Sequence, residues 1–304
     1  MSKRQKKRRF RRGVLTLTCV LLVTAIVAAV VWAKTPTDGL PRGLYSRNVL
    51  LVRVSDGESI LSRRADERIY PASLTKMMTV FVALQSIEDI GAAVLLDDGD
   101  FEGLVEQDAV QAGFLPGEEV PAIDLMYGAL LPSGAECCVA LARYAAGDEE
   151  AFVEKMNEKA AELGMTGTHF TGVIGLHDDS HYTTARDMAT LLRAALQNET
   201  FFEIFTSTRH STKPTNLHPD GITVRSSFFE KAEETEFPGI SRWAAAGGKT
   251  GYTSQAGLCL ASLAEKDGEQ YILITAGADG STRTAPHHIE DAVAVFRGAE
   301  IPEH

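Results

Sequence analysis

An uninterrupted run of twenty uncharged residues near the amino terminus constrains this chain more than any other feature. Residues 14–33 contain no Asp, Glu, Lys or Arg, and a helix of that length crosses the roughly 30 Å hydrocarbon layer of a bilayer. Eight Lys or Arg and no acid precede the run. Because positive charge stays on the cytoplasmic side, we expect a basic cytoplasmic tail at 1–13, a single transmembrane anchor at 14–33, and the rest of the chain outside the cytoplasm.

A cleaved signal peptide is the alternative, because Val31, Trp32 and Ala33 resemble a small-residue cleavage site. The apolar run is longer than the usual signal core of about 7–15 residues, which favours the uncleaved anchor in the cell membrane over a secreted protein. Both interpretations place the working domain outside the cytoplasm.

The charge distribution excludes one class of partner. The whole chain carries −11, so the part after residue 33 carries −19. A domain this acidic repels a phosphate backbone, and we expect no nucleic acid partner.

The hydrophobic pattern predicts one α+β domain. Apolar strands are predicted at 48–54 and 59–62, joined by an Asp-Gly turn, and three more at 244–252, 257–264 and 270–277. Helices are predicted between and after them, at 73–84, 121–131, 135–146, 148–163, 184–197 and 286–297. The pattern weakens over 201–238. Strands at both ends with helices between them indicate an antiparallel sheet built from the two termini beside a mainly helical subdomain. We expect a linker at 34–47 and the catalytic domain at 48–298.

The first motif that carries chemistry is a serine followed three residues later by a lysine. Ser73 and Lys76 follow a turn-favouring proline and begin an apolar helix, so their side chains share one face. The pair supplies a nucleophile and a base, and the Ser73 N–H is one of the unpaired donors at a helix start that can bind an oxyanion. By itself the pair also fits an ordinary helix start with a solvated lysine.

Two further stretches carry candidate residues. Ser133 lies in a Pro-Ser-Gly turn between two apolar helices, where its hydroxyl could relay a proton or, more simply, cap a helix. Lys249, Thr250 and Gly251 begin a strand, where glycine permits close approach of an extended peptide with its carboxylate near Lys249. The alternative is a Gly-rich turn with an exposed lysine. A phosphate-binding loop is disfavoured because the Gly-x-x-x-x-Gly-Lys pattern is absent from the sequence.

In this order the three motifs resemble those of penicillin-binding proteins and serine β-lactamases. The surrounding sequence is similar to that of the serine D-alanyl-D-alanine carboxypeptidases, the low-molecular-mass penicillin-binding proteins of peptidase family S11. The matching stretches are Tyr-Pro-Ala-Ser-Leu-Thr-Lys-Met at 70–77, Leu-Leu-Pro-Ser-Gly at 130–134, Gly-Leu-His-Asp at 175–178, His-Tyr-Thr-Thr-Ala-Arg-Asp-Met-Ala at 181–189 and Gly-Lys-Thr-Gly-Tyr-Thr at 248–253. The resemblance covers about 44–297 and implies a β-lactamase/transpeptidase-like fold that removes the terminal D-Ala from peptidoglycan stem peptides and is acylated by β-lactams.

The resemblance also implies a role for each site residue. Ser73 forms an acyl-enzyme, with its own N–H and that of Tyr252 binding the oxyanion. Lys76 acts as a neutral base, with its pKa lowered by burial and by the charge of Lys249. Ser133 protonates the departing D-Ala. Residues expected to hold its carboxylate are Lys249, Thr250 and Arg283. No metal or cofactor is implied.

One position departs from the family pattern. The second motif normally ends in Asn, whose amide holds the substrate and the catalytic lysine, but here Ala135 stands in its place. A buried hydrogen bond to a charged group contributes about 1.5–3 kcal/mol, so we expect a weakened or retuned enzyme. A β-lactamase and a non-catalytic penicillin-binding wall sensor are the alternatives. Because the sequence stops at His304, we also expect no carboxy-terminal β-domain.

The remaining cysteines and histidines are expected to have packing roles. Cys137, Cys138 and Cys259 are expected to fill the core, although a disulfide from Cys259 to one of the other two stays open. His177 and His181, with two aspartates between them, could suggest zinc, but the resemblance favours a loop that packs against the helical subdomain.

Overall fold

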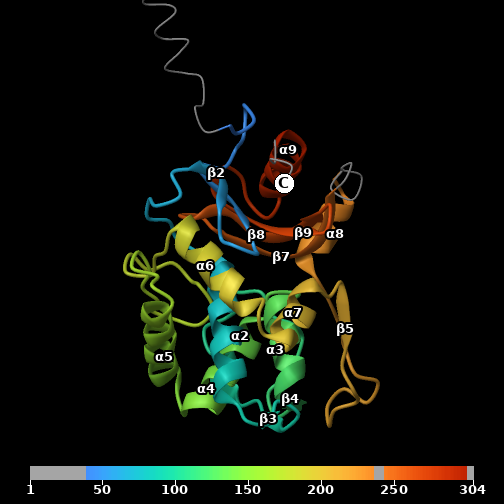
Figure 1. The fold of residues 1–304 in the computed structure, drawn as a ribbon. Helices are drawn as coiled ribbons and strands as arrows, with labels where there is room; N and C mark the ends of the chain where they lie inside the picture. The colour runs from blue at the N-terminus through green and yellow to red at the C-terminus, as the bar shows by residue number, and fades with distance from the viewer. Residues whose placement is uncertain (1–38, 236–242, 300–304) are drawn as a thin grey trace, which may run out of the picture.

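A five-stranded antiparallel sheet organises the molecule (Figure 1). The computed structural model describes residues 39–235 and 243–299. The strand order is β2 (Ser59–Arg63), β1 (Asn48–Arg53), β9 (Glu269–Ala278), β8 (Gly257–Lys266) and β7 (Trp243–Thr253). The amino-terminal hairpin therefore pairs with the last strand, and β7 forms an edge. This confirms the prediction of a sheet built from both termini.

Both faces of the sheet are covered, which explains the nearly continuous apolar sequence of β1. Leu50 and Val52 pack into the core under the helical layer, whereas Val49 and Leu51 belong to a second core. That second core lies against α9 (His287–Gly298), which packs on the opposite face of the sheet (Figure 1).

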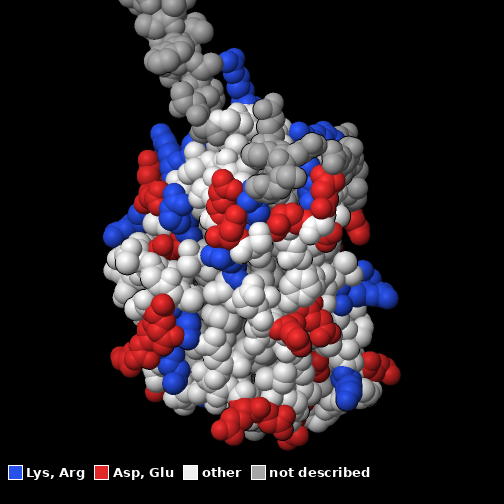
Figure 2. Space-filling model, viewed as in Figure 1, with Lys and Arg blue, Asp and Glu red and all other residues white. Residues whose placement is uncertain are grey.

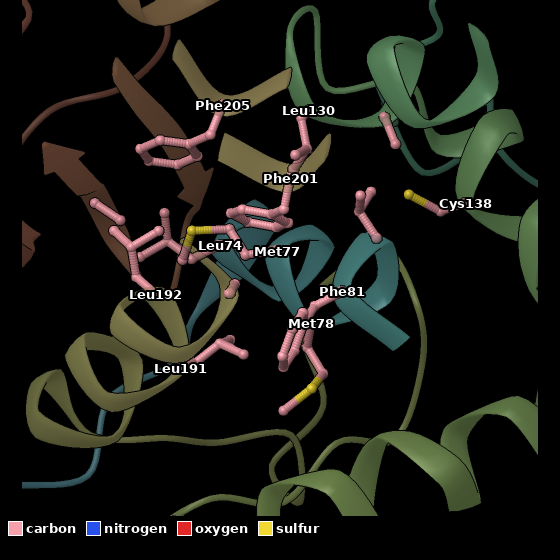
Figure 3. Close-up of a cluster of buried hydrophobic side chains, with 14 of the residues drawn as sticks. Leu74, Met77, Met78, Phe81, Leu130, Cys138, Leu191, Leu192, Phe201 and Phe205 are labelled. Carbon is pink, nitrogen blue, oxygen red and sulfur yellow. The ribbon is translucent and has the colours of Figure 1, made fainter. Parts of the chain in front are cut away.

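The helical layer surrounds α2 (Thr75–Ser86), which runs through its centre (Figure 1). The other helices of this layer are α3 (Ala122–Leu130), α4 (Ala135–Ala146), α5 (Glu149–Glu162), α6 (Ala185–Ala195) and α7 (Glu199–Thr206). Met77 and Phe81 of α2 lie near Phe201 of α7, and Phe81 and Phe201 meet edge to face at 6.2 Å (Figure 3). These contacts hold α2 against α7 in the core.

The hydrophobic pattern of the sequence does not predict several short helices and strands. They are η1 (Ala72–Leu74), β3 (Ala93–Leu95), η2 (Asp98–Phe101), β4 (Glu119–Pro121), β5 (Arg209–Ser211), β6 (Thr223–Arg225) and α8 (Ser227–Glu233). The stretch 201–238, whose pattern is weak, contains β5, β6, α8 and most of α7.

The structure answers the question of the disulfide. Cys137, Cys138 and Cys259 are buried free thiols, as the core-filling interpretation predicts. For the membrane anchor, residues 14–33 lie outside the described residues. Among the helices that are described, none combines the length and apolarity needed to span a bilayer. Within the expected linker, residues 39–47 pack against the domain, where Tyr45 stacks on His287 of α9 at 3.8 Å.

Candidate active site

Ser73 and Lys76 lie where the chain passes from η1 into α2. Ser73 sits in the tight turn of η1, and Lys76 occupies the first turn of α2. The Lys76 ammonium donates to the Ser73 hydroxyl at 3.0 Å and to the carbonyl of Ile174 at 2.8 Å. The spacing of the two residues therefore does place the hydroxyl and the amine in direct contact.

The buried position of Lys76 prepares it to act as a base. Its side chain is 3% exposed, and this burial lowers its pKa from the ordinary value, although the nearby Glu136 carboxylate partly opposes the shift. A neutral amine is favoured where a charge is poorly hydrated. Lys76 can then accept the proton that Ser73 loses on attacking a carbonyl.

Ser133 occupies a strained turn between α3 and α4. Its φ is +79°, a left-handed conformation that is rare for serine, and its hydroxyl is buried with no hydrogen-bond partner among the described residues. The helix cap of α4 is Gly134, so Ser133 does not serve as the cap. An unpartnered hydroxyl held in this way is available to a substrate.

Lys249 lies in β7, beneath the surface of the site. It is 1% exposed, and its ammonium donates to the Thr250 carbonyl at 2.9 Å. Burial and then the charge of Lys76 lower its pKa well below the ordinary value. The pKa values of both lysines are therefore lowered, by burial first and also because two buried ammonium groups close together disfavour each other's charge.

The edge of β7 passes unusually close to the nucleophile. A Cβ added at Gly251 would lie 3.1 Å from the Ser73 nitrogen and 3.3 Å from the Pro71 carbonyl oxygen, so only glycine fits without displacement. The adjacent Thr250 hydroxyl exchanges a 3.0 Å hydrogen bond with the hydroxyl of Ser227 in α8. The third motif thus brings a strand edge to the serine, as its glycine predicts.

A cleft of about 620 Å³ joins these residues. Of the sequence-predicted site residues, those that line it are Ser73, Ser133, Thr250, Gly251, Tyr252 and Arg283. Lys76 and Lys249 lie beneath its wall. The sequence analysis missed several other lining residues, among them Gln107, Asp108, Ser227, Lys231 and His288. No motif spacing marks them, because they come from three separate segments that only the fold brings together.

Two buried side chains hold the walls of the cleft. The Glu136 carboxylate accepts from the backbone N–H groups of Ala112 at 2.6 Å and Gly113 at 3.1 Å, which ties the segment before them to α4. His181 contacts the Thr75 hydroxyl at 2.8 Å and accepts from the Thr171 N–H at 3.0 Å, which ties the 171–181 segment to α2. Burial lowers the pKa of His181 to about 4, so its ring is neutral at pH 7. No group of three potential metal ligands occurs in the described parts of the chain.

The position of the usual Asn in the second motif is occupied here by a side chain without a hydrogen-bonding group. Ala135 is fully buried, its N–H donates to the Val110 carbonyl, and its methyl group can make no hydrogen bond. Lys76 instead finds its second acceptor in the Ile174 carbonyl.

A serine that accepts a hydrogen bond from a buried lysine, beside an edge strand and a cleft, has the geometry of a serine–lysine acyl-transfer site. The D-alanyl-D-alanine carboxypeptidase family, peptidase S11, matches residues 35–280, and the chain belongs to this family.

Individual relatives of the chain are also D-alanyl-D-alanine carboxypeptidases. The chain is 31% identical to D-alanyl-D-alanine carboxypeptidase DacF of Bacillus subtilis over 77% of its own length and 57% of that protein. It is 34% identical to DacA of Escherichia coli K12 over 62% of its length and 48% of that protein. The chain therefore spans about half the length of these curated relatives.

Solved structures show the same fold. The Streptomyces K15 DD-transpeptidase superimposes with a TM-score of 0.75 at 25% identity, covering 86% of this chain and 98% of that one. The Mycobacterium tuberculosis D-alanyl-D-alanine carboxypeptidase gives 0.72 at 26% identity, covering 85% and 92%.

Proposed function

We propose that this protein is a serine-type D-Ala-D-Ala carboxypeptidase that removes the terminal D-Ala from peptidoglycan stem peptides and is acylated by β-lactams. The observation that carries the proposal is the 3.0 Å contact between Ser73 and the buried Lys76, at the wall of a cleft bordered by β7. Family membership supports the same reaction.

In the proposed reaction, neutral Lys76 takes the Ser73 proton as the hydroxyl attacks the carbonyl of the penultimate D-Ala. The N–H groups of Ser73 and Tyr252 stabilise the developing oxyanion. Ser133 passes a proton to the amine of the departing D-Ala. Water then attacks the acyl-enzyme, which releases the shortened peptide and restores the serine hydroxyl.

The carboxylate of the leaving residue is held by Thr250 and Arg283, with the buried Lys249 side chain behind them. Because Ala135 offers no amide, we expect acylation to be slower than in an enzyme that has the Asn. We also propose that residues 14–33 anchor the protein as a single span, with the amino terminus in the cytoplasm and the cleft on the side where peptidoglycan lies.

The test uses the protein and its Ser73→Ala variant with two reagents, a fluorescent penicillin and a pentapeptide that ends in D-Ala-D-Ala. Stable labelling together with D-Ala release is expected for the wild type. The variant should lose both by at least about a thousandfold, because Ser73 is the hydroxyl that accepts a hydrogen bond from Lys76.

Other outcomes favour other functions. Rapid loss of the label with turnover of penicillin would indicate a β-lactamase. Stable labelling without peptide cleavage would indicate a wall sensor. D-Ala release that survives in the Ser73→Ala variant would contradict the proposed nucleophile.

A further inference from the structure

The cleft is cationic at the end where α8 and α9 approach it. Lys231 of α8, Arg283 and His288 of α9 all line its wall, whereas Asp108 is the only acidic residue that lines it within the described chain. This contrasts with the chain as a whole, which carries −11. Acidic and basic side chains are interspersed over the face seen in Figure 2. Cations gathered at one end of a cleft raise the local concentration of negatively charged ligands.

His288 has no hydrogen-bond partner in this wall. Its side chain is 1% exposed, and neither ring nitrogen has a partner in the described parts of the chain. Burial, and then the charge of Lys231, lower its pKa to about 3, so the ring is neutral at pH 7 and keeps one N–H to donate. An unsatisfied buried donor is costly, which is the condition that a bound ligand relieves.

The positive charge of Lys231 is not neutralised by a carboxylate of the described residues. No Asp or Glu among the described residues forms an ion pair with it, and its own neighbour in the sequence, Glu230, is exposed. Its charge is close enough to His288 and to Lys249 to lower the pKa of each. An ammonium group such as that of Lys231 forms short, strong hydrogen bonds with carboxylates.

We propose that Lys231 and His288 form an anion-binding position at the α8–α9 end of the cleft, which holds the free carboxylate of the leaving residue beside Thr250 and Arg283. These two residues then set the preference for a substrate with a charged terminus over one whose terminal carboxyl is amidated. The inference rests on the proposed carboxypeptidase function and adds two specificity-determining residues to it.

The experiment compares a pentapeptide ending in D-Ala-D-Ala with its carboxy-terminal amide. Lys231→Met is expected to lower kcat/KM for the acid about tenfold to a hundredfold, mainly through KM, and to leave the amide unchanged. Lys231→Arg should keep most of the preference, and His288→Leu should reduce it in the same direction. Lys155→Met is the matched control, because Lys155 is an exposed lysine on α5 that does not line the cleft.

Acylation rates by benzylpenicillin and by its methyl ester give the same comparison without peptide cleavage. If the wild type releases no D-Ala, the proposed function fails, and the penicillin pair still tests the anion position. The inference is overturned if Lys231→Met leaves the acid-to-amide and acid-to-ester ratios unchanged. It is equally overturned if the variant slows both members of a pair alike, since that is the result of a purely structural role.

Discussion

The charge state of Lys76 is set by the side chains that surround it. Burial lowers its pKa, and the carboxylate of Glu136 raises it. Glu136 is itself buried, with its own pKa raised by that burial, and it accepts two backbone hydrogen bonds from Ala112 and Gly113. This one residue therefore both holds a wall of the cleft and tunes the base.

At the residue scale, Glu136→Gln is expected to move the acid limb of the acylation rate to lower pH. The amide is nearly the same size and its oxygen can still accept the two N–H groups, but the charge that favours protonated Lys76 is gone. The pKa of Lys76 then falls, and a larger fraction of it is neutral at a given pH. The rate of labelling by a fluorescent penicillin, measured against pH, checks this.

A limb that moves to higher pH, or does not move, would contradict this role for Glu136. The midpoint of thermal unfolding of the variant, measured alongside, shows whether the hydrogen bonds to Ala112 and Gly113 are kept.

At the scale of elements, η1 depends on a glycine from a distant segment. Gly175 has φ +85°, and a Cβ there would collide with the Ala72 carbonyl oxygen and approach the Thr75 hydroxyl at 2.8 Å. The 171–181 segment thus lies directly on the turn that holds Ser73. The Ile174 carbonyl, in the same segment, accepts a hydrogen bond from Lys76.

Gly175→Ala is expected to lower both stability and acylation rate, because η1 must move to make room. Gly147→Ala is the matched control, since Gly147 also has positive φ, +94°, but no atom lies within 4 Å of its added Cβ. The control should lose only the conformational cost of about 1–2 kcal/mol, and Gly175→Ala about 1–3 kcal/mol more. Thermal unfolding and penicillin labelling measure the two effects, and equal losses in the two variants would refute the packing argument.

The long elements were predictable because each carries its own signal. The α4 and α6 helices show helical spacing of apolar residues, and β8 and β9 flank an Asp-Gly turn. The short β5–β6 ribbon was not predictable, because contacts from far along the chain hold it: Asn216 accepts from the Glu119 N–H, and Thr215 donates to buried Glu118.

The site residues divide in the same way into local and long-range ones. Ser73, Lys76, Ser133 and the 249–251 stretch belong to local motifs, so sequence identifies them. Glu136, Lys231 and His288 act through the space that they share with residues far away in the chain, and no local pattern records that proximity.

At the scale of the whole molecule, buried neutral histidine makes stability depend on pH. His181 has a pKa of about 4 in the folded protein and 6.5 as its ordinary value. Between these values the unfolded chain binds the proton and the folded protein does not. Stability therefore falls as pH drops from about 6.5 to about 4, by roughly 3 kcal/mol for this one residue.

We expect the free energy of unfolding, measured by urea titration at several pH values, to be nearly constant near pH 7–8 and to decline below pH 6.5. His181→Gln should lower stability at pH 7, because its contacts with Thr75 and Thr171 change, and should make the decline shallower. A decline of unchanged steepness in the variant would show that other groups, such as His288 or the carboxylates, account for it.

The pairing of β1 with β9 has a consequence for how the protein is made. β1 leaves the ribosome early, yet it needs a partner that ends at Ala278, more than two hundred residues later. Until then the nascent hairpin exposes an apolar edge that could associate with other chains. The chain must therefore be synthesised at least as far as Ala278 before the sheet can close, and Ser73 meets the completed sheet only after that point.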